Sequence, residues 1–350
     1  MRRREFLATA AAAGALTGLA GAMSPAFAAR PFTFTSWGGA LSDAEKAAFT
    51  DPFAQMKGIE IINTSPTETA KIKAMVEAGA VEWDLVDVGG RTVWQGGEDG
   101  FLEKLDLSKI PNAAALEPGW VSPYGIATST GATIIAWSSN AFPDGGPQSW
   151  ADFYDVKRFP GPRGLYKYFY YNYEAALLAA GVKRDEVFPM TEEKVEMALA
   201  KVAELKPNVS VWWGAGAQPP QLLSTGELAL SSAWSGRMLA ATAEGAPVGY
   251  TYKDGIAWAN WWVIPKGSPH VETAHELLNY ALAAENQAKL LELKTYGPVL
   301  GSATDSADAE TRKILVMTED NIKDMVILNE EEANKYSRAY EERWNQLMLG

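Results

Sequence analysis

The 350-residue chain has no cysteine and only two histidines, His270 and His275. Without cysteine it has no disulfide, no thiolate nucleophile and no cysteine-ligated zinc or iron–sulfur site. The histidines lack the His-Glu-x-x-His spacing of a zinc protease, and neither a Gly-x-Ser-x-Gly elbow nor a Gly-x-x-x-x-Gly-Lys-Ser/Thr phosphate loop occurs. We therefore expect no catalytic residue, no metal and no cofactor. The alternative is an enzyme that uses a pair of carboxylates in a cleft.

Positive charge is also scarce, because 43 Asp and Glu outnumber 31 Lys and Arg and give a formal net charge of −12. An acidic surface repels nucleic acid and anionic membranes, so we expect neither as a partner. The binding of a small solute depends on its pocket more than on net charge, so the acidic composition does not argue against a small-molecule ligand.

Long hydrophobic runs are confined to the N-terminus, where three arginines precede an Ala/Gly/Leu-rich stretch that ends in Ala26-Phe27-Ala28. This order predicts an export signal over 1–28, cleaved after Ala28, and a periplasmic protein. The segment Arg3-Arg4-Glu5-Phe6-Leu7 resembles the twin-arginine motif, although Ala8 replaces the usual lysine. The apolar stretch is too weak for a stable membrane span. An N-terminal anchor is the alternative.

After the signal, strand patterns alternate with helix patterns, which favours α/β layers around a mostly parallel sheet. Ser42-x-x-Glu45 predicts a capping box at the first helix, and Pro52 predicts a restart of that helix. We expect strands at 31–36, 59–62, 84–88, 131–137, 209–212, 228–231 and 256–264. We expect helices at 67–78, 192–205, 271–293 and from 330 onward, and a loop at 302–310.

What the chain has in abundance is tryptophan, 13 in all, often beside glycine where a strand is expected to end. Trp37-Gly38-Gly39, Gly89-Gly90-Arg91 and Trp234-Ser235-Gly236-Arg237 share this pattern. Ligands of open α/β sheets bind at the carboxyl ends of strands, so these segments are candidates for a binding site. A tryptophan at a strand end is also an ordinary core residue.

The segment Gly255–Pro265, GIAWANWWVIP, places three tryptophans in five positions. Strand alternation puts Trp258, Asn260 and Trp262 on one face and Trp261 on the other, where we expect core packing. Trp258 and Asn260 would then offer a ligand a flat wall and a directional hydrogen bond. An indole face also attracts ammonium groups.

In order and spacing, these segments resemble the periplasmic solute-binding proteins of ABC importers, in the spermidine/putrescine-binding group, over nearly the whole mature chain. The markers are Ser36-Trp37-Gly38-Gly39, Trp83-Asp84-Leu85-Val86, Pro123-Tyr124-Gly125, Ser149-Trp150-Ala151-Asp152-Phe153, Gly226-Glu227-Leu228, Trp234-Ser235-Gly236-Arg237, Trp258-Ala259-Asn260 and Tyr296-Gly297-Pro298.

The resemblance implies a type II periplasmic binding protein fold, in which two α/β lobes are joined by two crossover strands and close on a solute. We place lobe 1 at 29–136 plus 262–306 and lobe 2 at 137–261 plus 307–350, with the crossovers near 131–138 and 256–264. The implied partners are a small solute and an ABC permease with its cytoplasmic ATPase, and we expect a monomer.

The sequence departs from polyamine binders where those proteins hold ammonium groups with carboxylates. The expected aspartate is Asn260, two further acidic positions fall on Tyr168 and Tyr171, and Arg237 replaces a small residue. A guanidinium suits a carboxylate, which it binds through two parallel hydrogen bonds. We therefore expect a small carboxylate-bearing or zwitterionic amine ligand, with Arg91 as a second clamp candidate.

Polyamine binding and ferric-ion binding through Tyr170, Tyr171 and Tyr173 are the alternatives. The residues expected at the ligand are Trp37, Gly38, Arg91, Tyr124, Tyr168, Tyr171, Trp234, Arg237, Trp258, Asn260 and Tyr296.

Overall fold

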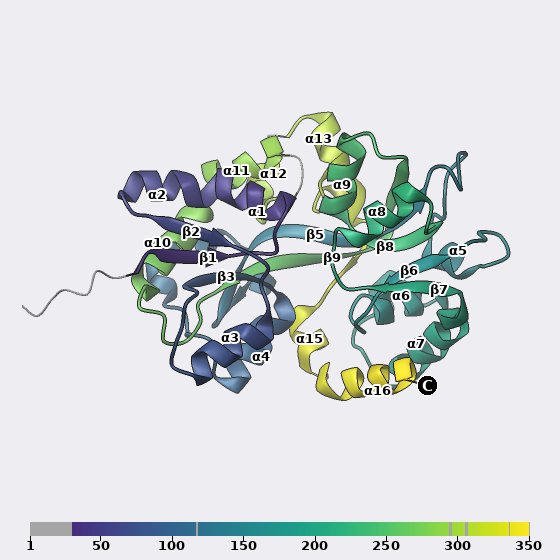
Figure 1. The fold of residues 1–350 in the computed structure, drawn as a ribbon, viewed down its shortest axis with the longest axis horizontal. Helices are drawn as coiled ribbons and strands as arrows, with labels where there is room; N and C mark the ends of the chain where they lie inside the picture. The colour runs from purple at the N-terminus through teal and green to yellow at the C-terminus, as the bar shows by residue number, and fades with distance from the viewer. Residues whose placement is uncertain (1–29, 117, 294–295, 305–306, 336, 350) are drawn as a thin grey trace, which may run out of the picture. The chain divides into compact units, whose positions relative to one another are not determined.

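The expected alternation of strands and helices folds into one ten-stranded sheet (Figure 1). The computed structural model describes residues 30–116, 118–293, 296–304, 307–335 and 337–349. The predicted export signal and its cleavage site lie outside the described residues. From Phe32 onward the chain forms one compact unit. The strands are β1 (Phe32–Thr35), β2 (Ile61–Thr64), β3 (Leu85–Gly89), β4 (Val121–Ser122), β5 (Gly125–Ser138), β6 (Arg163–Tyr166), β7 (Val209–Trp213), β8 (Leu230–Trp234), β9 (Val248–Val263) and β10 (Val326–Ile327).

The order of the strands divides the sheet into two wings that share its two longest strands. The order is β2-β1-β3-β9-β5-β8-β6-β7, with β10 beside β9 and β4 beside β5. Pairing is parallel within the first wing (β1–β3) and the second wing (β6–β8), and antiparallel where β3, β9, β5 and β8 meet. The strands β5 and β9 therefore carry the chain between the wings.

Helices cover both faces of each wing, as expected for parallel strands (Figure 1). Those of the first wing are α1 (Ala40–Glu45), a π-helix (Lys46–Thr50), α2 (Asp51–Lys57), α3 (Thr69–Glu77), α4 (Gly90–Asp99), α10 (Val271–Ala281), α11 (Ala284–Leu293) and α12 (Gly301–Thr304). Those that follow β5 and β9 on the second wing are α5 (Trp150–Tyr154), α6 (Asn172–Ala179), α7 (Glu192–Leu205), α8 (Gln218–Thr225), α9 (Ser235–Ala243), α13 (Ala309–Ile314) and α14 (Glu319–Ile322).

The buried apolar side chains form separate clusters on the two sides of the crossover strands. One cluster draws on residues 32–127 and 259–303 and fills the first wing. Two others draw mainly on residues 132–258 and 316–344 and fill the second wing. This division runs close to the expected lobes, whose boundaries stay a prediction.

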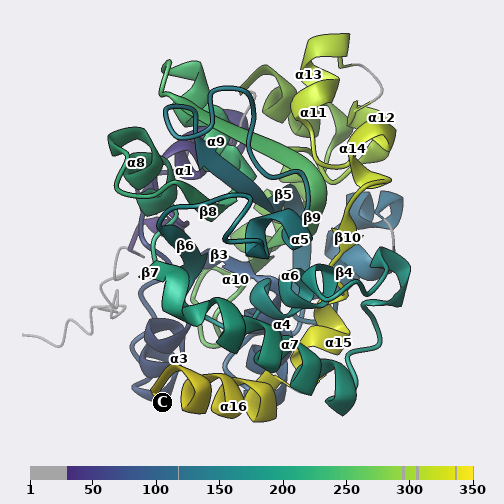
Figure 2. The same cartoon turned by 90° about the vertical axis from the view of Figure 1, so that its right-hand side faces the viewer.

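The C-terminal segment makes a further passage between the wings that the sequence analysis did not anticipate. β10 pairs with β9 at Ile256 and Ala257, and α15 (Glu330–Lys335) then contacts α4 of the first wing. α16 (Ser337–Leu349) returns to the second wing, where it lies beside α7 in both views (Figures 1 and 2). The tail therefore ties the two wings together.

Two local expectations were wrong. α1 begins at Ala40, before Ser42, whose hydroxyl accepts a hydrogen bond from the backbone N–H of Gly38 at 2.8 Å. Glu45 is buried and bonds to side chains of the core rather than capping the helix. The expected loop at 302–310 overlaps α12 and α13, because Asp308 caps α13 by accepting from the N–H of Thr311.

Candidate ligand-binding site

The loop after β1 brings a glycine backbone against an arginine of the second wing. Gly38 and Gly39 both have positive φ, 83° and 59°, which favours glycine at these positions. A Cβ built on Gly39 would lie 2.0 Å from Nη1 of Arg237, so only glycine allows this approach. Arg237 Nη2 donates to the carbonyl of Gly38 at 2.7 Å.

Arg237 lies in the first turn of α9, which follows β8 directly. Among the described residues the recorded hydrogen bond of its guanidinium is to the carbonyl of Gly38, no ion pair is recorded for it, and its buried Nε has no hydrogen-bond partner. A half-buried guanidinium whose only recorded acceptor is one carbonyl retains both charge and donors. It is equipped to bind an anion.

Four aromatic rings run from this arginine into the second wing. Ring centroids are 6.1 Å apart for Trp37 and Trp234, 6.4 Å for Trp234 and Trp258, and 6.2 Å for Trp258 and Tyr171. The indole N–H groups of Trp37 and Trp234 are buried without a partner. The sequence analysis expected all four at the ligand, and the structure brings them together.

Trp258 stands on the crossover strand over a glycine. Its ring occupies the space that a side chain of Gly131 would take, and its Nε1 donates to Thr133 Oγ1 at 3.1 Å. Trp261, on the other face of β9, is fully buried and meets Trp94 of α4 with centroids 5.1 Å apart. Alternation along β9 was therefore correctly predicted.

Tyr171 adopts a backbone conformation that bulky residues rarely take, with φ 69° and ψ −30° at the start of α6. Such strain concentrates at functional sites. Burial, followed by the charge of Glu330, raises the pKa of its hydroxyl well above the usual value. Tyr168 lies nearby and stacks on Tyr170, with centroids 5.5 Å apart.

Two carboxyl groups lie close to Tyr171 that the sequence analysis did not single out. Burial raises the pKa of Glu174 to about 7, and burial together with Glu174 raises that of Glu330 to about 8. The carboxyl group of Glu330 packs against the backbone of Gly90, where a Cβ would lie 2.4 Å from it. Glycine at that position allows α15 to approach α4.

Asn260 is buried and satisfied within the protein. Its amide donates to Ser129 Oγ at 3.0 Å across the two crossover strands. In the sheet it lies opposite Gly89, and a Cβ on Gly89 would meet nothing within 4 Å. The β3 position that faces Asn260 therefore carries no side chain, and the space beside it is open.

Tyr296 lies between groups of opposite charge. Burial raises the pKa of its hydroxyl to about 12, while Arg237 lowers it and Asp87 and Glu45 raise it. Its backbone neighbour Gly297 bridges to Thr130 of β5. Tyr296 therefore lies within electrostatic reach of both Arg237 and a buried carboxyl pair.

That pair, Asp87 of β3 and Glu45 of α1, was missed by the sequence analysis. Both side chains are fully buried. Glu45 accepts from Trp262 Nε1 at 3.0 Å and from the hydroxyl of Ser36. The available signal was a charged residue inside an otherwise apolar strand, Leu85-Val86-Asp87-Val88, since buried charges need a specific partner.

Arg91 and Tyr124 are not brought to the aromatic row. Arg91 pairs with Glu341 of α16, Nη2 to Oε2 2.5 Å, and its guanidinium lies 5.5 Å from the ring centroid of Phe169 and 5.8 Å from that of Tyr170. Tyr124 packs on α4, where its ring fills the space beside Gly97. Their roles at the ligand stay predictions.

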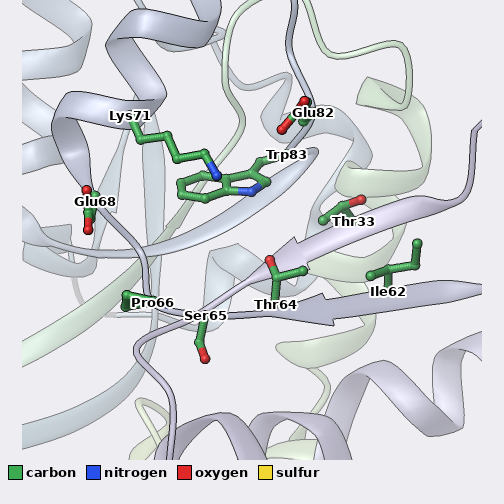
Figure 3. A pocket seen from close by; sticks show the side chains of 9 residues that line it. All are labelled: Thr33, Ile62, Thr64, Ser65, Pro66, Glu68, Lys71, Glu82 and Trp83. Carbon is green, nitrogen blue, oxygen red and sulfur yellow. The ribbon is translucent and has the colours of Figure 1, made fainter.

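A surface depression of about 380 Å³ lies elsewhere, at the β1–β2 edge of the first wing (Figure 3). Lys71 lies 4.4 Å from the centroid of the Trp83 ring on one side of it. None of the expected ligand residues lines it. Within the described part of the chain, no group of three or more His, Asp or Glu is placed to hold a metal ion.

The fold is that of a type II periplasmic binding protein, with a mixed sheet flanked by helices, as expected. The sequence profile of the bacterial extracellular solute-binding protein family matches residues 48–316. The chain therefore belongs to this family, the substrate-binding components of ABC transporters, whose partners are a small solute and a permease with its ATPase. Among the described residues no helix has the length and apolarity needed to cross a membrane.

Three known proteins show how close the similarity is. The γ-aminobutyric acid-binding protein of Pseudomonas aeruginosa is 37% identical over 287 residues, covering 81% of each chain. The spermidine/putrescine-binding periplasmic protein 1 of Haemophilus influenzae is 27% identical over 253 residues, covering 69% of this chain and 68% of its own. The solved structure of MotA from A. tumefaciens in complex with glucopine is 33% identical, with a TM-score of 0.85 and coverage of 91% and 99%.

Proposed function

We propose that this chain captures a small compound bearing a carboxylate, most simply a zwitterionic amine, between its two wings and delivers it to an ABC permease. The observation that carries the proposal is Arg237, which has no carboxylate partner among the described residues although it lies beside Gly38 of the opposite wing. Two of the three relatives described above support this ligand class, since one is named for γ-aminobutyric acid and another was solved with glucopine.

The proposed mechanism is closure of the wings around the solute. Trp37 and Gly38 belong to the first wing, Trp234 and Arg237 to the second, and Trp258 to the crossover strand. A ligand that contacts both wings favours the closed form by its differential affinity for that form. The permease would then recognise the closed form. The proposal is for binding without turnover, by a monomer.

The aromatic row would supply the remaining contacts. Trp37, Trp234 and Trp258 offer apolar walls and, at Trp37 and Trp234, buried N–H donors without a partner. Walls of this kind suit the carbon skeleton of a small acid. Arg237 would orient the ligand and recognise the charge of its carboxylate.

Thermal unfolding with a matched panel tests the ligand class. A ligand at 100 times its Kd stabilises the native state by about 2.7 kcal/mol, which raises Tm by roughly 4 °C for a chain of this size. We expect such a shift with short aminocarboxylates and little or none with 1,4-diaminobutane or spermidine. Stabilisation by the diamines and not by the acids would overturn the proposal in favour of polyamine binding.

Export is proposed separately, from the sequence of residues 1–28 and the periplasmic relatives. We expect the mature chain to begin at Ala29 and to be found in the periplasm. Mass spectrometry of the protein purified from that compartment tests the cleavage site. A retained N-terminus would favour a membrane anchor.

A further inference from the structure

The site lacks the carboxylate that the resemblance to polyamine binders leads one to expect two residues after the pocket tryptophan. That position is Asn260, whose amide is already bonded to Ser129. A neutral, satisfied amide gives little to an ammonium group. If the ligand carries an amine as well as a carboxylate, another acid must receive it.

Such an acid lies one step away on the neighbouring strand. Antiparallel pairing sets Gly89 opposite Asn260 and Asp87 opposite Trp262, so all four residues share one face of the sheet. Gly89 carries no side chain, and the space where its Cβ would project is open. Asp87 therefore lies buried on the same face as Asn260, two residues along β3 from the position that Gly89 leaves empty.

Asp87 is fully buried, and neither of its carboxylate oxygens has a hydrogen-bond partner among the described residues. The Trp37 indole and the backbone N–H of Val88 lie near enough to favour its ionised form, without completing a hydrogen bond. Its neighbour Glu45 is bonded to Ser36 and Trp262 and lies near enough to Asp87 for the two carboxyl groups to share a proton. An unbonded buried carboxyl group is costly unless a partner supplies the missing donors.

Arg237 has the opposite deficiency to Asp87: the carboxyl group of Asp87 lacks donors, and the guanidinium of Arg237 lacks an anion. That guanidinium lacks an anion, Asp87 lacks a cation, and Tyr296 feels the charge of both. No ion pair between Arg237 and Asp87 is recorded within the described chain, so neither cancels the other. A ligand with one positive and one negative end would satisfy both at once.

We propose that Asp87, backed by Glu45, receives the ammonium group of a zwitterionic amine whose carboxylate is bound by Arg237. The proposal rests on the proposed function, because it takes the carboxylate at Arg237 as given. It places the amine subsite on β3 of the first wing, with the carboxylate subsite on α9 of the second. A zwitterion bound in this way contacts both wings through its charges.

Proton release should accompany binding. Burial, followed by the charge of Glu45, raises the pKa of Asp87 well above its usual range, and burial raises that of Glu45. The other ionisable groups that face them are Tyr296, neutral near pH 7, and the guanidinium of Arg237 beyond it. The pair therefore retains a proton near neutral pH. An arriving ammonium group favours the ionised carboxylate and displaces that proton.

The experiment is isothermal titration calorimetry of the full mature chain with 2-, 3- and 4-aminobutanoate, using butanoate as their common deaminated reference. We expect the best isomer to bind the wild type at least 10-fold tighter than butanoate. D87N should weaken that isomer about 10- to 100-fold and leave butanoate within about 3-fold, as loss of a hydrogen-bonded charge predicts. R237A should weaken butanoate and the isomers alike.

Buffers of different ionisation enthalpy measure the proton. We expect up to one proton released at pH 7 when the wild type binds its best isomer, and none with butanoate. D87N N260D, which moves the acid one step across the same sheet face, should recover part of the lost affinity. Recovery separates amine recognition from a merely structural role for Asp87.

Several results would overturn the inference. A wild type that binds butanoate as tightly as every isomer, or a D87N variant that weakens butanoate as much as the isomers, contradicts the amine subsite and leaves the proposed function standing. Undiminished butanoate binding by R237A contradicts the proposed function instead, and no binding of any panel compound contradicts both. If D87N does not fold, proton release by the wild type becomes the test, and its absence would overturn the inference.

Discussion

Arg91 and Arg237 offer the same chemical group in opposite surroundings. Each lies in the first turn of a helix that directly follows a strand, and each reaches from one wing to the other. Arg91 is neutralised by Glu341 and covered by Phe169 and Tyr170. Arg237 contacts only the carbonyl of Gly38 among the acceptors recorded for it, beside indole rings that leave donors unbonded.

This difference between the two arginines decides how much of each guanidinium's charge remains available to a ligand. A guanidinium that is paired with a carboxylate has little left for a second anion, whereas one bonded to a single carbonyl keeps its charge and most of its donors. Sequence position alone makes the two arginines equivalent candidates. Their neighbours pair Arg91 with Glu341 across the wings, and the proposed function gives Arg237 to the solute.

The largest effect is expected from removal of the unpaired arginine. Arg237→Ala should weaken binding of a carboxylate ligand at least 100-fold, about 3 kcal/mol, because a buried anion would lose its partner. Arg237→Lys should recover only part, since an ammonium cannot reproduce the paired hydrogen bonds. Calorimetric Kd values measure both. A loss below about 3-fold in Arg237→Ala would show that the comparison assigns the wrong arginine.

The region around Arg91 should make stability depend on pH. Glu174 and Glu330 have folded pKa values of about 7 and about 8 against an ordinary 4.5. Between pH 4.5 and about 8, the native state therefore binds more protons than the unfolded chain. The free energy of unfolding should therefore fall by several kcal/mol as pH rises from about 5 to about 8. The Asp87–Glu45 pair acts with the same sign.

Urea unfolding of the ligand-free protein at a series of pH values measures this slope. The E174Q E330Q variant should flatten it without removing it, because Asp87 and Glu45 remain. A stability that rises between pH 5 and 8, or a slope unchanged in the variant, would contradict the assignment of these carboxyl groups.

An intermediate effect is expected from crowding the Arg237 contact. Gly39→Ala would place a Cβ 2.0 Å from Arg237 Nη1 and strain a backbone with φ 59°, so the guanidinium must move. Binding should weaken about 10-fold, with a stability loss of about 1–2 kcal/mol. Gly58→Ala controls for a positive φ alone, since its φ is 65° and its Cβ would meet nothing. Its ψ is 35°, in the left-handed helical region, whereas that of Gly39 is −148°. Equal binding losses in both variants would mean that backbone strain alone is responsible.

The smallest effect is expected at Arg91. Arg91→Ala should leave the Kd of a carboxylate ligand within about 2-fold and lower stability by about 1 kcal/mol, because its ion pair is partly exposed. Glu341→Ala is the matched partner variant and should behave alike. A 10-fold loss of binding in Arg91→Ala, absent in Glu341→Ala, would restore Arg91 as a ligand clamp.

Much of the fold could be predicted because its signals are local. Hydrophobic periodicity located α7 at its observed ends, Glu192–Leu205, and strand alternation separated Trp258 from Trp261. The restart at Pro52 is also present, since a π-helix ends at Thr50 and α2 follows. The capping box at Ser42 failed because Glu45 is drawn into bonds with Ser36 and Trp262, the latter far along the chain.

The candidate site could be predicted only in part for the same reason. Trp37, Trp234 and Arg237 follow from strand ends beside glycines, and Trp258 follows from strand alternation in the segment 255–265, so these signals are visible in the sequence. For Asp87 the sequence offers only a charge inside an apolar strand, and its surroundings, Glu45, Gly89 and Tyr296, come from distant segments or from the fold.

By itself the sequence determined that this is an α/β chain with aromatic strand ends, few catalytic groups and an arginine where related proteins suggest a cation-binding site. Those properties depend on residue type and short-range spacing, which can be read from the sequence without a structure. Only the tertiary structure decided which arginine is neutralised, which carboxyl groups are buried together, and that the C-terminal tail ties the wings. Each of these depends on side chains distant in the sequence meeting away from water, where the presence or absence of one partner controls charge.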